Sequence, residues 1–320
     1  MASYSNTNES RLQQRKAQRA LDKLEQMPGM QEVKSQVEQI IHFNRVSKLR
    51  AQQGLKTHSQ SFHMVFTGNP GTGKTTAARL IGEAFIHLGL LKSSGDEAPF
   101  VEVHHADVTH PHVGQAEKTI KAKFAEARGG VLFIDEAYAF IASESSHNTG
   151  DKVIAAIVQL MEDMRDEIIV IAAGYPDNMS EFLDSNPGLR SRFSNTVHFP
   201  DYDVADLINI AIALSSEREY QISREYVEQL SKLLWAERFK PGFGNARTVR
   251  NIIEQSIRLQ SVRVSKMPSP SRYDLTMLTD VDLGIYAFVG DSEKDTLLRE
   301  LKRIQARLLE IDLRNIISKT

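Results

Sequence analysis

A glycine-rich run, GNPGTGKT at positions 68–75, limits the possible folds of this chain more than any other stretch. It matches the pattern G-x-x-x-x-G-K-[ST] without a gap. Glycines allow successive backbone N–H groups to point at one place, and such a loop at the start of a helix forms a concave site for anions. An apolar run at 63–67 precedes the loop, and a helical pattern follows it. We therefore predict a strand, a phosphate-binding loop and a helix, in that order.

The polar residues of this loop have defined roles in phosphate binding. The ammonium of Lys74 is expected on the β- and γ-phosphates, and the hydroxyl of Thr75 on Mg²⁺. The residues predicted to contact a nucleotide here are Asn69, Pro70, Gly71, Thr72, Gly73, Lys74, Thr75 and Thr76. The alternative is a glycine-proline turn that fits the pattern by chance, which the flanking strand and helix disfavour.

A second run, GGVLFIDEA at 129–137, predicts the other half of the same site. Its apolar strand would end in Asp135 and Glu136, and the carboxyl end of such a strand lies at the ligand-binding edge of a parallel sheet. Asp135 would hold Mg²⁺ directly or through water, and Glu136 would orient and polarise the attacking water. Alone, the acid pair could simply cap a helix. Together with the loop, it indicates hydrolysis of a nucleoside triphosphate.

Short runs rich in Val, Ile and Phe alternate with helical patterns up to Pro200. The predicted strands are 63–67, 100–104, 131–135, 168–173 and 196–199, and the helices between them include 75–88, 117–127 and 153–165. This alternation predicts an α/β fold with a five-stranded parallel sheet between layers of helices. After Pro200 the pattern becomes all-helical, which predicts a second, smaller domain.

Composition narrows the class of protein. Of 320 residues, 41% are hydrophobic and 25% are charged, as in globular proteins with a sizeable core. The net charge of -2 gives no global basic field for nucleic acid, so no nucleic-acid partner is expected. No run approaches the length of a membrane span, the N-terminus lacks a signal-peptide core, and there is no cysteine. We expect a cytoplasmic protein.

Five segments together resemble the AAA+ ATPases, in particular the subgroup that contains red-type rubisco activase, stage V sporulation protein K and the ATPase domain of type VII secretion. They are TGNPGTGKTT, GGVLFIDEAYAF, IAAGYPDNM, SNPGLRSRFSNTVHFPDY and FGNARTVRN. The likeness runs from about residue 21 to 283. It implies an AAA+ module, in which a P-loop αβα sandwich precedes a helical lid. It also implies ATP and ADP as ligands with Mg²⁺, and a homo-oligomer, expected to be a hexamer, with ATP at subunit interfaces.

On this basis the chain is divided into five parts. They are a disordered N-terminus at 1–14, a helical segment at 15–57 that is broken at Pro28-Gly29, an ATPase domain at 58–200, a helical lid at 201–290 and an amphipathic helix at 291–320. The last part carries an apolar stripe for which two roles remain open, docking on the lid and binding a partner or another copy.

The resemblance also assigns roles to arginines. NPGLRSRF resembles the stretch that donates an arginine to a neighbouring subunit's nucleotide, with Arg192 the first candidate for this arginine finger and Arg190 the second. A guanidinium delivered in this way stabilises charge that develops on the γ-phosphate. GNARTVRN resembles the sensor-2 segment, with Arg247 facing the γ-phosphate and Arg250 one turn later.

Three further positions follow from the resemblance, two of them with departures. PGM at 28–30 resembles the element near the adenine pocket, which places Gly29 and Met30 there. Most relatives outside this subgroup carry a polar sensor-1 residue, usually Asn, where this chain has Tyr175, with Asn178 as the other candidate. At the position of the aromatic pore residue that grips substrate, this chain has His112 followed by Val113. Histidine is flat but grips less apolar surface.

The function predicted from the sequence is remodelling of a protein substrate, driven by ATP hydrolysis in a ring. A nucleic-acid motor or loader is one alternative, and a nucleotide-dependent assembly switch is the other. Four histidines in HHADVTHPH invite a metal site, but their spacing gives no convergent geometry, so the only metal we predict is Mg²⁺ at Thr75 and Asp135.

Overall fold

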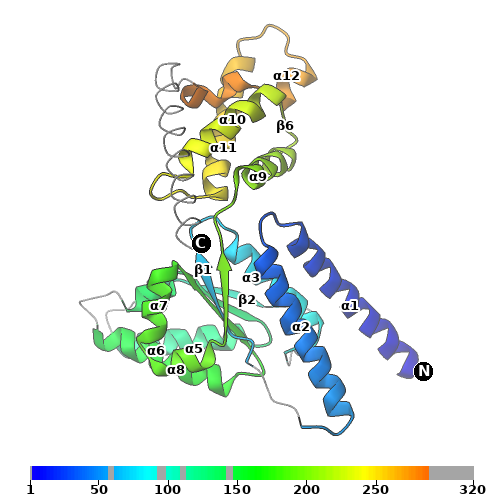
Figure 1. The fold of residues 1–320 in the computed structure, drawn as a ribbon, viewed down its shortest axis with the longest axis vertical. Coiled ribbons are helices and arrows are strands. Elements are labelled where there is room, and N and C mark those ends of the chain that lie inside the picture. Colours follow the sequence, from blue (N-terminus) through cyan, green and yellow to red (C-terminus); the bar gives the residue numbers. More distant parts are fainter. Residues whose placement is uncertain (1, 57–60, 92–98, 109–112, 142–146, 288–320) are drawn as a thin grey trace, which may run out of the picture. The chain divides into compact units, whose positions relative to one another are not determined.

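The computed structural model describes residues 2–56, 61–91, 99–108, 113–141 and 147–287 (Figure 1). The chain forms two compact units. The first contains the residues up to Leu207 together with Gly242–Thr248, and the second contains Ile208–Pro241 and the residues from Val249 onward.

The first unit is built on a five-stranded parallel sheet with strand order β2-β3-β4-β1-β5. The strands are β1 (Met64–Gly68), β2 (Phe100–Val103), β3 (Val131–Ile134), β4 (Ile169–Gly174) and β5 (Asn195–Phe199). Residues of β1, β3 and β4 are buried throughout, as expected for central strands covered on both faces. The predicted α/β fold is confirmed, and each strand lies within a residue or two of its predicted range.

Helices cover both faces of this sheet (Figure 1). One layer contains α1 (Ala2–Gln26), α2 (Gln31–Gln52) and α3 (Lys74–His87), and α1 packs along α3. The other contains α5 (Val113–Glu126), α6 (His147–Asp163), α7 (Pro176–Asp184) and α8 (Pro187–Arg192), with a single helical turn α4 (His105–Val108) and a 3₁₀ turn η1 (Ala137–Phe140) nearby. Val65 and its neighbours on β3 and β4 form one apolar core with this second layer.

The N-terminal helix is longer than the sequence predicted. We expected disorder over residues 1–14, but α1 begins at Ala2. A helix that is already formed extends at little cost per residue, and Ala17, Ala20 and Leu24 anchor this one through burial. The break between α1 and α2 lies at Pro28-Gly29 as predicted, and Gly29 takes a left-handed φ of 66°.

A buried histidine ties together three elements at the amino end of the sheet. The backbone N–H of Val170 donates to Nδ1 of His63 over 3.0 Å, and Nε2 lies 3.2 Å from the carbonyl oxygen of Met161. The imidazole is therefore neutral, with its proton on Nε2. Burial lowers its pKa to about 4. The ring also meets Phe193 edge-on at 6.4 Å, next to the end of α8.

The second unit is mainly helical. It contains most of α9 (Val204–Ser216) and α11 (Ala246–Val264), with α10 (Arg224–Glu237), α12 (Arg272–Thr276) and the 3₁₀ segment η3 (Asp280–Ala287). The sequence predicted helices only, but β6 (Gln221–Ile222) pairs with β7 (Met277–Leu278) in a small parallel sheet. Arg263 forms a bidentate ion pair with Asp282, which is buried. The predicted helix at 291–320 lies outside the described residues.

Candidate functional site

The glycine-rich loop lies between β1 and α3 and is held closely by the chain around it. Gly71 has a φ of 70°, and a Cβ there would lie 2.1 Å from the carbonyl oxygen of Gly244. Gly73 precedes the first turn of α3 with a φ of 90°, and a Cβ there would lie 2.5 Å from Cε of Met30. Both positions therefore require glycine for conformation and for space.

Lys74 opens α3 and turns its ammonium into the loop. Nζ donates to the carbonyl oxygens of Gly68 at 2.7 Å and Asn69 at 2.8 Å. Burial lowers the pKa of Lys74, and the charges of Asp135, Arg247 and Glu136 act on it as well, the carboxylates in the opposite direction. The charges of the acid pair and of Arg247 therefore all act on the one ammonium group that the loop holds.

Asp135 and Glu136 follow directly after β3, at the carboxyl end of a central strand. The backbone N–H of Asp135 donates to Val103, and its side chain accepts from the N–H of Glu136 over 3.1 Å. Glu136 has a left-handed φ of 50°, an unusual conformation for a residue with a long side chain. It costs about 1 kcal/mol. The carboxylate of Glu136 is held outward, in the exposed position expected of a group that meets water.

Tyr138 and Tyr175 form an aromatic pair beside these acids, with ring centroids 6.0 Å apart. Tyr175 follows β4 and precedes α7, whereas Asn178 is an exposed residue within α7. Burial, and then the charge of Glu136, raise the pKa of Tyr138 to about 12. Sequence reasoning missed Tyr138. The sequence feature related to Tyr138 is the glycine at position 174. A Cβ there would lie 2.8 Å from the Tyr138 ring, so the ring needs a glycine at this place.

The segment before α2 lies against the same loop. Met30 is buried against Gly73, and a Cβ at Gly29 would lie 3.0 Å from the ring of Tyr202. The Tyr202 hydroxyl in turn donates to the carbonyl oxygen of Thr72 over 3.0 Å, and burial raises its pKa to about 12. The structure thus brings Gly29 and Met30 to the loop, and it adds Tyr202, which sequence reasoning did not single out.

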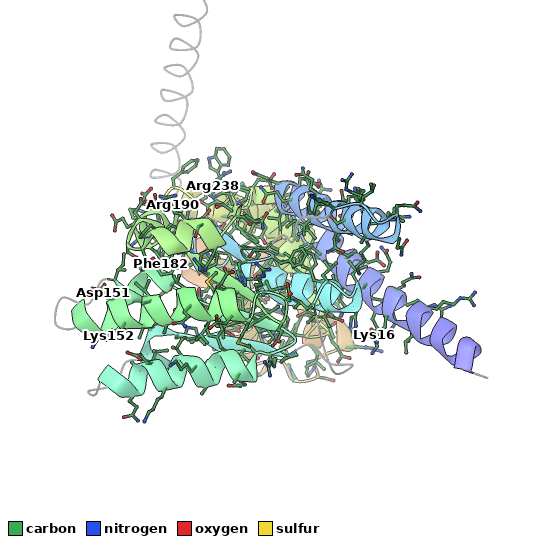
Figure 2. All side chains as sticks on the ribbon, turned by 90° about the horizontal axis from the view of Figure 1, so that it is seen from below. Lys16, Asp151, Lys152, Phe182, Arg190 and Arg238 are labelled. Carbon is green, nitrogen blue, oxygen red and sulfur yellow. The ribbon has the colours of Figure 1, made fainter. Side chains whose placement is uncertain are left out.

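The arginines occupy two different settings. Arg247 is exposed at the start of α11, where its charge acts on Lys74, and Arg250 is exposed three residues further along. Arg190, labelled in Figure 2, is a residue of α8. Its Nε pairs with Asp184 of α7 at 2.6 Å. Arg192 is one-quarter exposed, with an Nη2 atom 3.5 Å from Glu162 of α6. Its Nε is buried and has no hydrogen-bond partner among the described residues.

Two of the predicted positions lie at the edge of the described chain. His112 falls outside the described residues, and Val113 is the first residue of α5. Within the described ranges, no group of three or more His, Cys, Asp and Glu side chains is placed to hold a metal ion. Thr75 and Asp135 supply hydroxyl and carboxylate oxygens, the ligand type that Mg²⁺ prefers when substrate phosphates and water complete its shell. That donor chemistry fits Mg²⁺.

A phosphate-binding loop after β1, with an acid pair at the carboxyl end of β3 in the same parallel sheet, defines a P-loop nucleoside triphosphatase. Residues 64–201 match the family described as ATPase family associated with various cellular activities (AAA), and residues 203–293 match the AAA lid domain. The chain belongs to this family. It is an ATPase.

Three similar proteins indicate its subgroup within this family. Stage V sporulation protein K of Bacillus subtilis is 40% identical over 260 residues, which cover 80% of this chain and 79% of that protein. The chloroplastic ribulose bisphosphate carboxylase/oxygenase activase of Cyanidioschyzon merolae is 34% identical over 86% of this chain and 94% of its own length. The chromosomal protein CbxX of Cupriavidus necator is 38% identical over 71% of each chain. The predicted subgroup is confirmed.

Solved structures agree on the fold. The FIGL-1 AAA domain superposes with a TM-score of 0.58 at 18% identity, covering 87% of this chain and 88% of that one. The same domain in complex with ADP gives a TM-score of 0.57 at 20% identity, over 87% of this chain and 89% of its own. None of the described helices combines the length and hydrophobicity that a membrane span needs.

Proposed function

We propose that this ATPase remodels a protein substrate, and that it hydrolyses ATP between neighbouring copies of the chain in a ring, which we expect to be a hexamer. The observation that supports this most is the separation of its arginines. Arg247 acts on Lys74, whereas Arg190 and Arg192 face carboxylates of α7 and α6. An arginine finger from α8 therefore has its role in a neighbouring copy, and activity depends on assembly.

Within one copy, each residue of the candidate site has a separate proposed role in hydrolysis. Lys74 and the backbone of the loop bind and orient the β- and γ-phosphates, and Thr75 and Asp135 hold Mg²⁺, which neutralises phosphate charge when bound. Glu136 accepts a hydrogen bond from the attacking water and polarises it. Tyr175, at the carboxyl end of β4, is the proposed sensor-1 residue, and Gly29 and Met30 contact the adenine.

Arg192 is the better candidate for the finger on the basis of hydrogen bonding. Its Nη1 donates over 3.3 Å to the carbonyl oxygen of Gly188 and over 3.4 Å to Oγ of Ser191, and its ion pair with Glu162 is long, at 3.5 Å. Arg190 is already held by Asp184 at 2.6 Å, although its side chain is half exposed. A guanidinium held only by long contacts binds a phosphate oxygen with less loss of existing interactions.

A protein substrate is supported by the names of the relatives, one of which is an activase of ribulose bisphosphate carboxylase/oxygenase. Another is named for sporulation, so the names do not agree on one target. We propose that His112 and Val113 contact the substrate chain in the pore. Capture of bound proteins by a Glu136→Gln variant, which should retain ATP, identifies the substrate.

Mixing of two inactive variants tests the proposal. Lys74→Ala removes the phosphate contact of one interface, and Arg192→Ala removes the finger of another, so each alone should lack activity. Mixed rings contain some interfaces with both groups intact and should recover measurable hydrolysis. Activity per chain of the wild type should also fall on dilution. Absence of recovery in the mixture, together with constant activity at every dilution, would contradict shared sites.

A further inference from the structure

Three polar side chains connect the phosphate-binding loop to the segment that carries Arg247. Nδ2 of Asn69 donates to both carboxylate oxygens of Asp201, each at 3.0 Å. Nδ2 of Asn245 donates to Oδ1 of the same carboxylate at 2.8 Å. Asp201 thus accepts hydrogen bonds from two amides that are far apart in sequence, and we name Asn69, Asp201 and Asn245 the Asn–Asp–Asn bridge.

Backbone contacts reinforce the bridge. Asn245 also donates to the carbonyl oxygen of Pro70 at 3.3 Å, and the N–H of Ala246 donates to that of Gly71 at 3.2 Å. Gly71 and Gly244 meet so closely that no side chain fits between them. The loop residues that would surround the triphosphate are therefore bonded directly to Asn245 and Ala246, at the start of α11.

Asn245 is suited to this position by both its backbone and its side chain. It is fully buried with a φ of 48°, a left-handed conformation that asparagine tolerates better than most residues. Both polar atoms of its side-chain amide form hydrogen bonds. Oδ1 accepts from the N–H of Tyr202 at 3.0 Å, and Nδ2 donates to Asp201 and Pro70. Glycine would satisfy the backbone alone, and aspartate would face the Asp201 carboxylate with a like charge.

We propose that the Asn–Asp–Asn bridge positions Arg247 on the phosphate-binding loop, so that Asp201 and Asn245 are positioning residues for ATP hydrolysis. The proposal rests on the proposed function in one respect, the role of Arg247 at the γ-phosphate. A side chain that is displaced by even a small distance loses much of its effect on a transition state. Loss of the bridge should therefore affect turnover more than nucleotide affinity.

The first experiment compares single substitutions with their combination. Asn245→Asp should lower kcat at least about tenfold and change nucleotide affinity less than about threefold. Exchanging the groups, as Asp201→Asn with Asn245→Asp, restores an amide opposite a carboxylate and should return kcat to within about threefold of the wild type. Glu219→Gly is the control, because it changes another left-handed residue, in an exposed turn outside the site.

Asn69→Ala is the mild variant, for use if the buried substitution prevents folding. It removes one arm of the bridge at a partly exposed residue. Thermal unfolding of every variant should be measured beside turnover. A loss of kcat that follows the loss of stability across the set, including Glu219→Gly, would overturn the positioning role, as would an exchange variant that regains stability without turnover.

The second experiment asks whether the bridge acts through Arg247. In an Arg247→Ala background, Asn245→Asp should lower kcat by less than about threefold, because the group that it positions is already gone. A full effect in that background would overturn the proposal. So would normal turnover by Arg247→Ala alone. If Lys74→Ala also keeps normal turnover, the proposed site itself is wrong, which separates the two failures.

Discussion

The phosphate-binding loop and helix α8 differ in how far their polar groups are satisfied. In the loop, the ammonium of Lys74 has two carbonyl partners, and Asn69 and Asn245 share one carboxylate. In α8, Nε of Arg192 is buried without a partner among the described residues. Buried donors normally find a partner, since leaving one unpaired costs about 1–3 kcal/mol. We call the loop the complete region, because these polar groups are satisfied within one chain, and α8 the incomplete region, because this donor has no partner among the described residues.

The largest effect is expected at the complete region. Lys74 is the one cationic residue of the loop, so Lys74→Ala removes the positive charge expected at the phosphates. Hydrolysis of ATP should fall about 10³-fold or more. A coupled phosphate-release assay measures it, with Arg79→Ala as the control, an exposed cation further along α3. If the two variants behave alike, the assignment of the loop is wrong.

The incomplete region should show a nearly equal effect through assembly. Arg192→Ala should lower kcat about 10³-fold with little change in nucleotide binding, as for other arginine fingers. Arg190→Ala should cost less than about tenfold, because its ion pair is exposed. Steady-state kinetics and binding of a fluorescent ATP analogue distinguish the two arginines. The reverse ranking would make Arg190 the finger.

The stability of the fold around His63, which packs against Phe193 at the end of α8, should depend on pH. His63 has a folded pKa of about 4 against 6.5 for the free side chain. Between these values the unfolded chain binds a proton that the folded chain does not, so stability falls as the pH is lowered from 6.5 to 4. The contribution of His63 to this loss is about 3 kcal/mol. Denaturant unfolding measures it, and His63→Gln should show a correspondingly shallower pH dependence than the wild type.

The smallest effect is expected at Tyr138, next to the complete region. Its pKa of about 12 keeps the phenol protonated at working pH, so it adds no ionisation to the pH–rate profile. Tyr138→Phe keeps the ring against Tyr175 and should change kcat less than about threefold. If the pH–rate profile of the wild type has an inflection that is absent from Tyr138→Phe, the hydroxyl of Tyr138 takes part in hydrolysis.

The sequence predicted the strands and the loop because their signals are local. Apolar runs and glycine spacing depend on a few neighbouring residues, and they placed β1, β3 and β4 within a residue or two. The bridge depends on Asn69, Asp201 and Asn245, which are distant in sequence and unremarkable as residue types, so only folding brings them together. The extent of α1 was missed because its polar start carries no apolar period, and β6–β7 because two-residue strands leave no pattern.

The left-handed backbone of Glu136 limits which substitutions can raise the stability of such a protein without loss of activity. A left-handed turn at the residue that must carry the carboxylate favours glycine or asparagine for folding, and glutamate for hydrolysis. Variants that become more heat-resistant at this turn should therefore lose catalysis. If Glu136 has its proposed role, the enzyme keeps a less stable backbone at this residue so that its carboxylate can act on water.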